Sequence, residues 1–404
     1  MVKSMPTDSD AANVSGGQGK ASATPAAPSI SLPKGGGAIR GMGEKFVANP
    51  VPGTGSMSVP IATSPGRSGF GPQSSLSYDS GAGNGPFGFG WSLALPAITR
   101  KTDKGLPQYF DVAESDVFIL SGAEDLVPEF EKDNAAQWVI KDGKYVVHNK
   151  PRTVNRVTYN VRRYRPRIEG LFARIERWTN QSDPKDTFWR SISKDNVTTW
   201  YGKTPDSRIA DPADPTRIFS WLICQSHDDK GNILTYSYKA EDSRGIVQSQ
   251  AHERNRSDTT RQVQRYLKRV RYGNRTPFFP NYMPDQPSSP LPADSDWMFE
   301  VVFDYGEHDV NAPKPDDAGQ WTCRADPFSS YRAGFEVRTY RLCQRVLMFH
   351  HFPGEPGVAR IASCAPPTLL TPTRRTLPTH ATPFIPSYSS SPRRATSGMG
   401  RPAI

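Results

Sequence analysis

The sequence of 404 residues is poor in cysteine, and its few cysteines form no CxxC pair and no regular series. They are Cys224, Cys323, Cys343 and Cys364. Wide and irregular spacing of this kind indicates neither a disulfide framework nor a zinc site. We therefore predict no metal ligands.

Long apolar runs are also missing. No stretch approaches the roughly 18 residues that a membrane-spanning helix needs. Residues 1–29 lack the apolar segment of a secretory signal peptide. We expect no stable membrane insertion by this chain, and we expect any export to follow a route without a Sec signal.

A dense basic surface is missing as well, although the formal net charge is +10. Six arginines lie between Pro356 and Ile404, where Lys, Asp and Glu are absent, so the preceding residues carry only +4. The stretch Arg152–Arg167, which interleaves arginines with Tyr159 and Tyr164, is the best candidate for polyanion binding. We favour the alternative, the solvated face of a β-ribbon, and expect no nucleic-acid partner.

What the sequence does contain is short alternating runs, rich in β-branched and aromatic residues and bounded by Gly, Pro and Asn-Gly or Asp-Gly turns. Helical patterns are weak by comparison, and residues 261–270 fit either a helix or a strand. We predict a mainly β fold of antiparallel hairpins. The clearest strand-like runs are Ser56–Ile61, Ser75–Tyr78, Lys144–His148, Thr198–Tyr201, Ile233–Tyr238 and Phe299–Tyr305.

Composition divides the chain into three segments. Residues 1–33 are rich in Ser, Ala, Gly and Pro, which predicts a disordered leader. Residues 34–355 form the predicted β-rich domain. Residues 356–404 are a low-complexity tail whose composition changes abruptly after the strand-like run Arg345–Phe352. Such a switch is typical of a shifted reading frame, and our hypothesis is a frameshifted or truncated gene.

One glycine-rich segment, Gly83–Gly88, fits the dinucleotide-binding pattern G-x-G-x-x-G. That pattern requires a helix immediately afterwards, so that its N-terminal amides face the pyrophosphate. The following residues, including Trp91 and Pro96, do not resemble a helix start. We therefore predict a β-turn, with Phe87, Phe89 and Trp91 stacked on one face, and no bound cofactor.

Three other motifs contain residue types that catalyse reactions or bind metals in other proteins. Glu129-Phe130-Glu131 matches the E-x-E pair of arginine-specific ADP-ribosyltransferases, but the arginine strand and the S-T-S strand that should precede it are missing. A solvated loop is the preferred interpretation. No catalytic residue is predicted there.

Cys224 and His227, followed by Asp228 and Asp229, would suit a nucleophile and its base. No oxyanion-hole signature accompanies them, and Cys224 lies in an apolar run, so core packing is preferred. His350-His351 would suit a metal, but adjacent strand residues point to opposite faces.

The segment from Ser31 to Leu126 carries a more specific signal. It includes NPVPGTGSMSVPIATSPGRSGFGPQSSLSYDSGAGNGPFGFGWSLALPAITRK and ESDVFILSGAEDLVP. This segment resembles the N-terminal domain of Salmonella virulence plasmid B (SpvB) proteins and of insecticidal toxin complex B components, and the likeness extends loosely to residue 355. The element Gly231–Tyr238 also resembles the repeats of Rhs-type shells.

The resemblance implies part of an open β-shell and a non-catalytic structural role in a secreted toxin or virulence protein. Such a shell encapsulates or helps translocate a toxic C-terminal effector. The implied partners are an A-type translocation pore and a C-type effector component, and the implied location is the extracellular region, after the bacterial cytoplasm. The alternative is an NAD-dependent ADP-ribosyltransferase that modifies a host protein such as actin. Relatives carry that activity in a C-terminal domain that does not match this chain.

Overall fold

The computed structural model describes residues 45–49, 53–121, 125–170, 172–317, 319–353, 361–363 and 368–369. The chain divides into two units, Met1–Met42 and Gly43–Ile404, and all described residues belong to the second. The predicted leader, residues 1–33, lies outside the described residues. Within the described part of the chain, no helix is long and apolar enough to cross a membrane.

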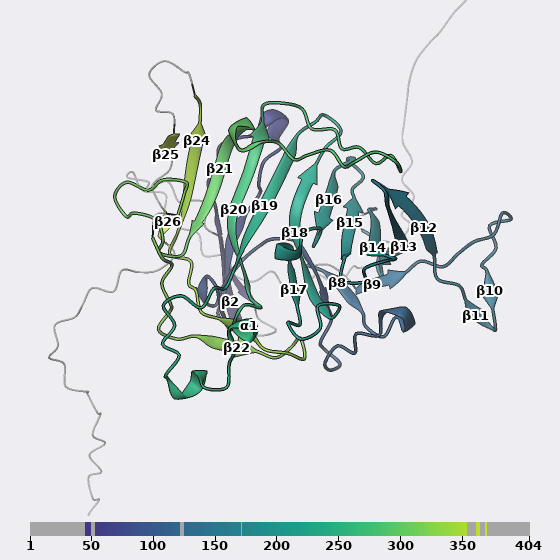
Figure 1. The fold of residues 1–404 in the computed structure, drawn as a ribbon, viewed down its shortest axis with the longest axis horizontal. Coiled ribbons are helices and arrows are strands. Elements are labelled where there is room, and N and C mark those ends of the chain that lie inside the picture. Colours follow the sequence, from purple (N-terminus) through teal and green to yellow (C-terminus); the bar gives the residue numbers. More distant parts are fainter. Residues whose placement is uncertain are drawn as a thin grey trace, which may run out of the picture. The chain divides into compact units, whose positions relative to one another are not determined.

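Most strands belong to one antiparallel sheet, and part of that sheet closes into a barrel (Figure 1). The ring closes because β18 pairs with β16 through residues near its C-terminal end and with β7 through residues near its N-terminal end. Two further strands flank it: β12 (Asn149–Val154) pairs with β13, and β17 (Arg208–Ala210) pairs with β18. The eight barrel strands are β7 (Ala97–Arg100), β8 (Phe118–Leu120), β9 (Asp125–Pro128), β13 (Val157–Pro166), β14 (Arg174–Asn180), β15 (Thr187–Ile192), β16 (Thr198–Tyr201) and β18 (Ile218–His227).

Successive side chains of a strand point to opposite sides of the sheet. In these strands apolar residues occupy both sides. Along β14 and β15, Ile175 and Trp189 point into the barrel, while Trp178 and Phe188 pack outside it. The interior is aromatic: the ring of Phe118 lies 4.9 Å from that of Trp189. Both faces are therefore buried along much of these two strands.

Beyond β18 the same sheet continues as an extension, β19-β20-β21-β24, with β25 and β26 paired to the outer edge of β24. These last two strands come from the predicted tail. Residues 261–270, which fitted a helix or a strand, lie largely in β20. The extension strands are β19 (Ile233–Ala240), β20 (Arg265–Asn274), β21 (Trp297–Asp304), β24 (Arg345–His351), β25 (Ile361–Ser363) and β26 (Thr368–Leu369).

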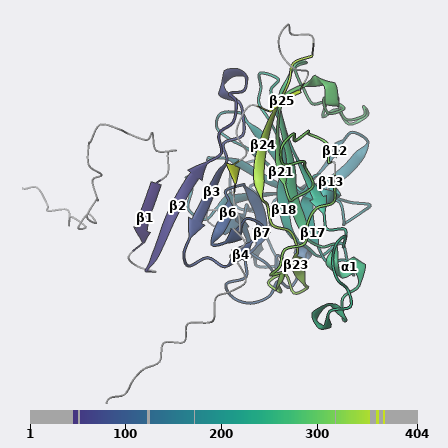
Figure 2. The same ribbon diagram turned by 90° about the vertical axis from the view of Figure 1, so that its left-hand side faces the viewer.

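A second sheet, β1-β2-β3-β6, forms a layer beside the extension (Figure 2). Leu76 of this layer shares one buried cluster with Val270 and Phe303 of the extension. The cluster makes this half of the molecule a two-layer sandwich. The strands are β1 (Lys45–Asn49), β2 (Thr54–Pro60), β3 (Ser75–Asp79) and β6 (Trp91–Leu93).

Small elements complete the described chain. The mainly β prediction is confirmed, since the described residues contain a single α-helix, α1 (Asp258–Arg261), and short 3-10 turns. The 3-10 turns are η1 (Arg67–Gly69), η2 (Asp111–Ala113), η3 (Pro205–Ser207), η4 (Ala251–Glu253) and η5 (Asp294–Asp296). The isolated hairpins pair β4 (Asn84–Gly85) with β5 (Gly88–Phe89), β10 (Ile140–Lys141) with β11 (Lys144–Tyr145), and β22 (Phe328–Ser330) with β23 (Val337–Thr339).

The glycine-rich segment Gly83–Gly88 forms the β4-β5 hairpin, so the predicted turn is confirmed. The predicted stacking of its aromatic rings is wrong. Phe87 is buried against Phe303, with ring centroids 6.2 Å apart, whereas Phe89 is exposed and Trp91 packs on Tyr78. The turn separates the rings because Gly88 and Gly90 adopt positive φ, which redirects the chain between them.

Candidate functional site

Arginines inside the barrel form the first of two buried charged groups. Arg100 of β7 and Arg177 of β14 are almost fully buried, and the β7-β8 loop brings three carboxylates to them. Arg100 Nη1 lies 2.6 Å from Asp111 Oδ1 and 2.7 Å from Asp116 Oδ2. We call these residues, together with Arg162 and Glu114, the interior arginine cluster.

The remaining contacts of the interior arginine cluster tie it to the barrel wall. Arg177 Nη2 lies 3.2 Å from Glu114 Oε1, and Arg162 pairs with the same carboxylate. Tyr164 donates its hydroxyl to Glu114 as well, at 2.8 Å. Burial would raise the pKa of Asp111, but Arg100 and Arg177 outweigh burial and lower it. Every carboxylate of the cluster therefore has a cationic partner, and the loop is fixed to the barrel.

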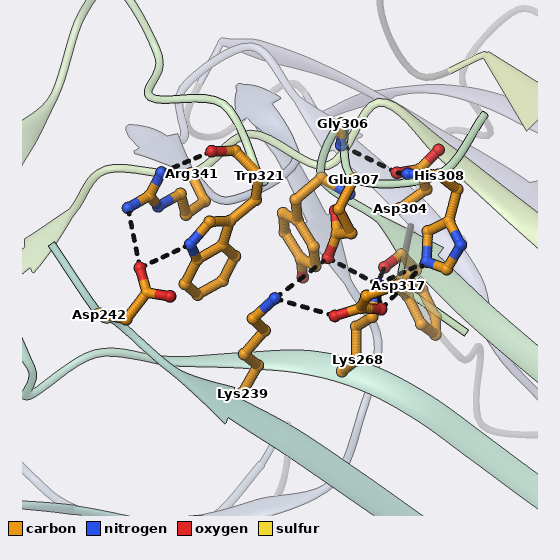
Figure 3. Close-up of polar contacts among 12 residues, drawn as sticks. Lys239, Asp242, Lys268, Asp304, Gly306, Glu307, His308, Asp317, Trp321 and Arg341 are labelled. Carbon is orange, nitrogen blue, oxygen red and sulfur yellow. Dashed lines mark hydrogen bonds and ion pairs between the residues drawn. The ribbon is translucent and has the colours of Figure 1, made fainter. Parts of the chain in front are cut away.

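The second group lies in the extension and is shown in Figure 3. Its members differ in burial: Lys268, Glu307 and His308 are buried, Lys239 is half-buried and Asp317 is exposed. Lys239 of β19 and Lys268 of β20 meet Glu307 and His308, from the turn after β21, and Asp317 from the following loop. We call these five residues the lysine–carboxylate centre. Lys268 Nζ lies 2.6 Å from Glu307 Oε1, 2.8 Å from His308 Nε2 and 3.1 Å from Asp317 Oδ1.

The lysine–carboxylate centre has the donor set of a metal site. One ligand atom from each of Glu307, His308 and Asp317 lies within 4.8 Å of the other two. However, the ammonium group of Lys268 contacts all three of these atoms. His308 Nδ1 lies 2.8 Å from the carbonyl oxygen of Lys314, which leaves Nε2 as the acceptor for Lys268. A divalent cation would meet two ammonium groups here, so the geometry favours a structural centre in which lysine supplies the positive charge.

Aromatic and guanidinium groups extend the lysine–carboxylate centre on one side (Figure 3). The Trp321 ring lies 4.3 Å from Lys239 Nζ and 4.4 Å from the Arg341 guanidinium carbon. Trp321 Nε1 donates to Asp242 at 2.7 Å, and Arg341 pairs with buried Glu241. Cations stacked on a desolvated indole and paired with carboxylates stabilise the packing between loop and sheet.

Glu129-Phe130-Glu131 starts an excursion from the barrel edge. The Glu129 amide donates to the carbonyl oxygen of Arg163, and Glu131 pairs with Lys150 at 3.5 Å. Phe130 is 40 % exposed. Neither carboxylate belongs to either buried charged group, and the absence of catalysis here stays a prediction.

Cys224 and His227 lie on β18 but have separate partners. Cys224 is buried among Trp178, Phe188 and other apolar residues, its thiol donates to the carbonyl oxygen of Trp200, and burial raises its pKa. His227 Nε2 lies 3.3 Å from the hydroxyl of Tyr282. The preferred interpretation of Cys224 as a core residue is confirmed.

His350 and His351 point to opposite sides of β24, as predicted. His350 Nε2 lies 2.7 Å from Ser64 Oγ, whereas His351 Nε2 lies 2.8 Å from Glu300 Oε2. The two imidazole rings therefore lie on opposite faces of the strand and have different partners. They do not form one metal site.

The basic stretch Arg152–Arg167 is dispersed by strand alternation. Arg162 points into the barrel, Arg156 bonds the backbone of Asp285, and Arg163 and Arg165 lie on the outer face of β13. It does not form a continuous basic stripe.

Sequence reasoning missed both buried charged groups. Their members are scattered across strands and loops, and no short motif connects them. One usable signal existed: in Arg174–Trp178, alternation places Arg177 on the same face as the apolar Ile175. An arginine on a core face predicts a buried acidic partner.

The chain is similar to known proteins over most of its length. Residues 49–352 match the family described as Salmonella virulence plasmid 65kDa B protein. The chain belongs to this SpvB family. It is 39 % identical over 332 residues to the mono(ADP-ribosyl)transferase SpvB of Salmonella choleraesuis (strain SC-B67). That match covers 81 % of this chain and 52 % of the relative, so the chain spans about half the length of the curated relative.

Solved structures of the SpvB family and of a toxin complex share the fold. The N-terminal domain of effector protein SpvB from Salmonella typhimurium strain LT2 matches with a TM-score of 0.62 and 36 % identity, over 76 % of this chain and 90 % of that domain. A chain of the Photorhabdus luminescens Tc holotoxin pore matches with a TM-score of 0.64 and 36 % identity, over 85 % of this chain and 15 % of that one. The resemblance seen in the sequence is confirmed, and the domain is one found in virulence and toxin proteins.

Proposed function

We propose that this chain is a non-catalytic structural module of a secreted bacterial toxin or virulence protein. It contributes strands to a β-shell that encapsulates or helps translocate a toxic C-terminal effector. Its partners are an A-type pore subunit and a C-type effector component. The observation that carries the proposal is the 85 % of this chain that matches one chain of the Tc holotoxin pore.

The ion pairs of the two charged groups support this proposal. In the interior arginine cluster and in the lysine–carboxylate centre, the acids and bases pair with one another and connect loops to strands. An active site usually keeps a titratable group poised for a substrate. The two groups instead use their charges to fix the fold.

The alternative, ADP-ribosyl transfer, rests on the name of the Salmonella relative, of which the match covers about half. Glu129 and Glu131 are the residues that would have to carry it. Glu131 pairs with Lys150 at 3.5 Å. No contact in the described residues favours that activity over the structural role.

A chimera tests the proposed function. Residues 45–353 replace the matching segment of the toxin-complex B chain, which is then produced together with its C-type effector component. We expect the effector fragment to stay protected from added protease, as in the parent complex. A chimera that folds and assembles but leaves the effector open to cleavage would contradict the role in the shell.

A further inference from the structure

Residues 129–148 form an arm that projects from the barrel (Figure 1). It is inserted between β9 and β12, which both pair with β13, and it carries the β10-β11 hairpin. Figure 1 shows β10 and β11 beyond β12, away from the barrel. The bridges Phe130↔Val147 and Lys132↔Trp138 close the arm on itself.

The arm exposes a cluster of large apolar side chains. Exposed fractions are 40 % for Phe130, 47 % for Trp138, 59 % for Ile140 and 53 % for Tyr145. The Phe130 ring lies 6.3 Å from the Trp138 ring and 5.3 Å from the Tyr145 ring. Six of the eight tryptophans of the chain are buried, so an exposed Trp138 within an aromatic cluster marks a contact surface.

Basic side chains lie beside this aromatic cluster around a cavity of about 530 Å³. Phe130 and Trp138 form one wall, and the outer face of β13 supplies Arg163 and Arg165. Lys132 and Lys150 complete the cationic lining, against the single carboxylate of Glu129, and His148 also lines the cavity. The lining therefore combines an excess of positive charge with aromatic surface.

Several of these groups lack a full set of partners. Arg165 is exposed and forms no ion pair among the described residues, and the nearest carboxylate to Arg163 Nε is Glu176, at 4.0 Å. Arg163 Nε and His148 Nδ1 are shielded atoms without a hydrogen-bond partner. A carboxylate entering the cavity could pair with the exposed guanidinium of Arg165, which has no ion-pair partner among the described residues.

We infer that the arm and this cavity bind an acidic peptide segment in which carboxylates alternate with apolar side chains. Arginine binds carboxylate in a planar two-point geometry, and the aromatic cluster would cover a neighbouring apolar residue. Nucleic acid fits less well because the arginines of Arg152–Arg167 form no continuous basic stripe along which a phosphate backbone could lie. Peptide binding at the arm and cavity does not depend on the proposed shell.

The probe is a fluorescent short peptide of alternating Glu and Leu, compared with the same peptide carrying Gln in place of Glu, on the full chain. We expect the Glu peptide to bind at least about tenfold more tightly, which corresponds to ~1.4 kcal/mol. Arg165→Glu and Trp138→Ala should each weaken that binding about tenfold. Both residues are exposed, so the variants should fold, and circular dichroism checks this.

Matched controls are Arg254→Glu, at an exposed arginine outside the arm and the cavity lining, and Phe172→Ala, at an exposed aromatic residue outside the arm. Both should bind the Glu peptide as the unmodified chain does. Equal binding of the Gln peptide, no binding of the Glu peptide, or unchanged binding by Arg165→Glu would overturn the inference. Binding of heparin but not of the peptide, with loss in Arg165→Glu, would overturn it in favour of a polyanion site.

Discussion

The barrel and the extension are two regions of one sheet, and they bury their charges in different ways. The barrel closes through β16 and β18, and its arginines lie among aromatic rings with carboxylates from a single loop. The extension packs against a second sheet, and its lysines hold carboxylates from a turn and a loop at its surface. Guanidinium is weakly hydrated and planar, whereas ammonium is compact and strongly hydrated. The enclosed interior arginine cluster therefore uses arginine alone, whereas the loop-covered region uses lysine beside arginines such as Arg341.

The largest effect is expected from Arg100→Met, which leaves Asp111 and Asp116 in the barrel without their main partner. Removing one member of a buried ion pair typically costs about 3–5 kcal/mol. Urea unfolding measures this loss, and Asp111→Asn with Asp116→Asn in the same variant should recover part of it. A loss below about 1 kcal/mol would show that the arginine is not structurally required.

Acid should weaken the outer face of the barrel next. Burial first, and then the charges of Lys203 and Arg190, lower the pKa of His227 from 6.5 to about 4. Because the unfolded state binds the proton more tightly, stability is complete above pH 6.5 and falls as the pH drops toward 4. We expect a loss of about 2–3 kcal/mol from this residue.

Unfolding of the unmodified chain, His227→Gln and His252→Gln at neutral and acidic pH separates this effect from carboxylate titration. His227→Gln should lose less stability on acidification than the unmodified chain. His252→Gln, at a side chain that is 53 % exposed and 3.7 Å from Glu253, should alter the acid sensitivity much less than His227→Gln. Equal acid sensitivity in all three proteins would rule out His227 as the cause.

Lys268→Met tests the extension and should cost less than Arg100→Met. Glu307 and His308 lose their shared donor, but Lys239 still lies 2.9 Å from Asp317 Oδ2 and 3.7 Å from Glu307 Oε1. We expect a loss of about 2 kcal/mol, within the range for hydrogen bonds to charged groups. Lys230→Met, at an exposed turn, is the control. A larger loss than for Arg100→Met would reverse the contrast between the two regions.

The smallest effect on stability belongs to the arm, which lies outside both regions. Trp138→Ala should change the free energy of unfolding by less than about 0.5 kcal/mol, since the ring is half exposed and contacts mainly arm residues. Urea unfolding of the variant beside Phe172→Ala checks this. A loss of several kcal/mol would show that the arm supports the fold.

Local pattern predicted the strands well, because alternation and turn residues in runs such as Ile233–Tyr238 report directly on β structure. Barrel closure was not predicted. It depends on pairs such as Ser220↔Thr99, which are far apart in the sequence and leave no local signature. For the same reason, the arginines of Arg152–Arg167 looked like one basic stretch, although strand alternation sends Arg162 inward and Arg163 outward.

The proposed structural role is tested most directly by an assay of ADP-ribosyl transfer from NAD. The chain is incubated with labelled NAD and a host-cell extract containing actin, beside Glu129→Gln and Glu131→Gln variants. The structural role predicts no label transfer above the protein-free background, and no difference among the three proteins. Transfer of label by the unmodified chain that disappears in either variant would contradict it.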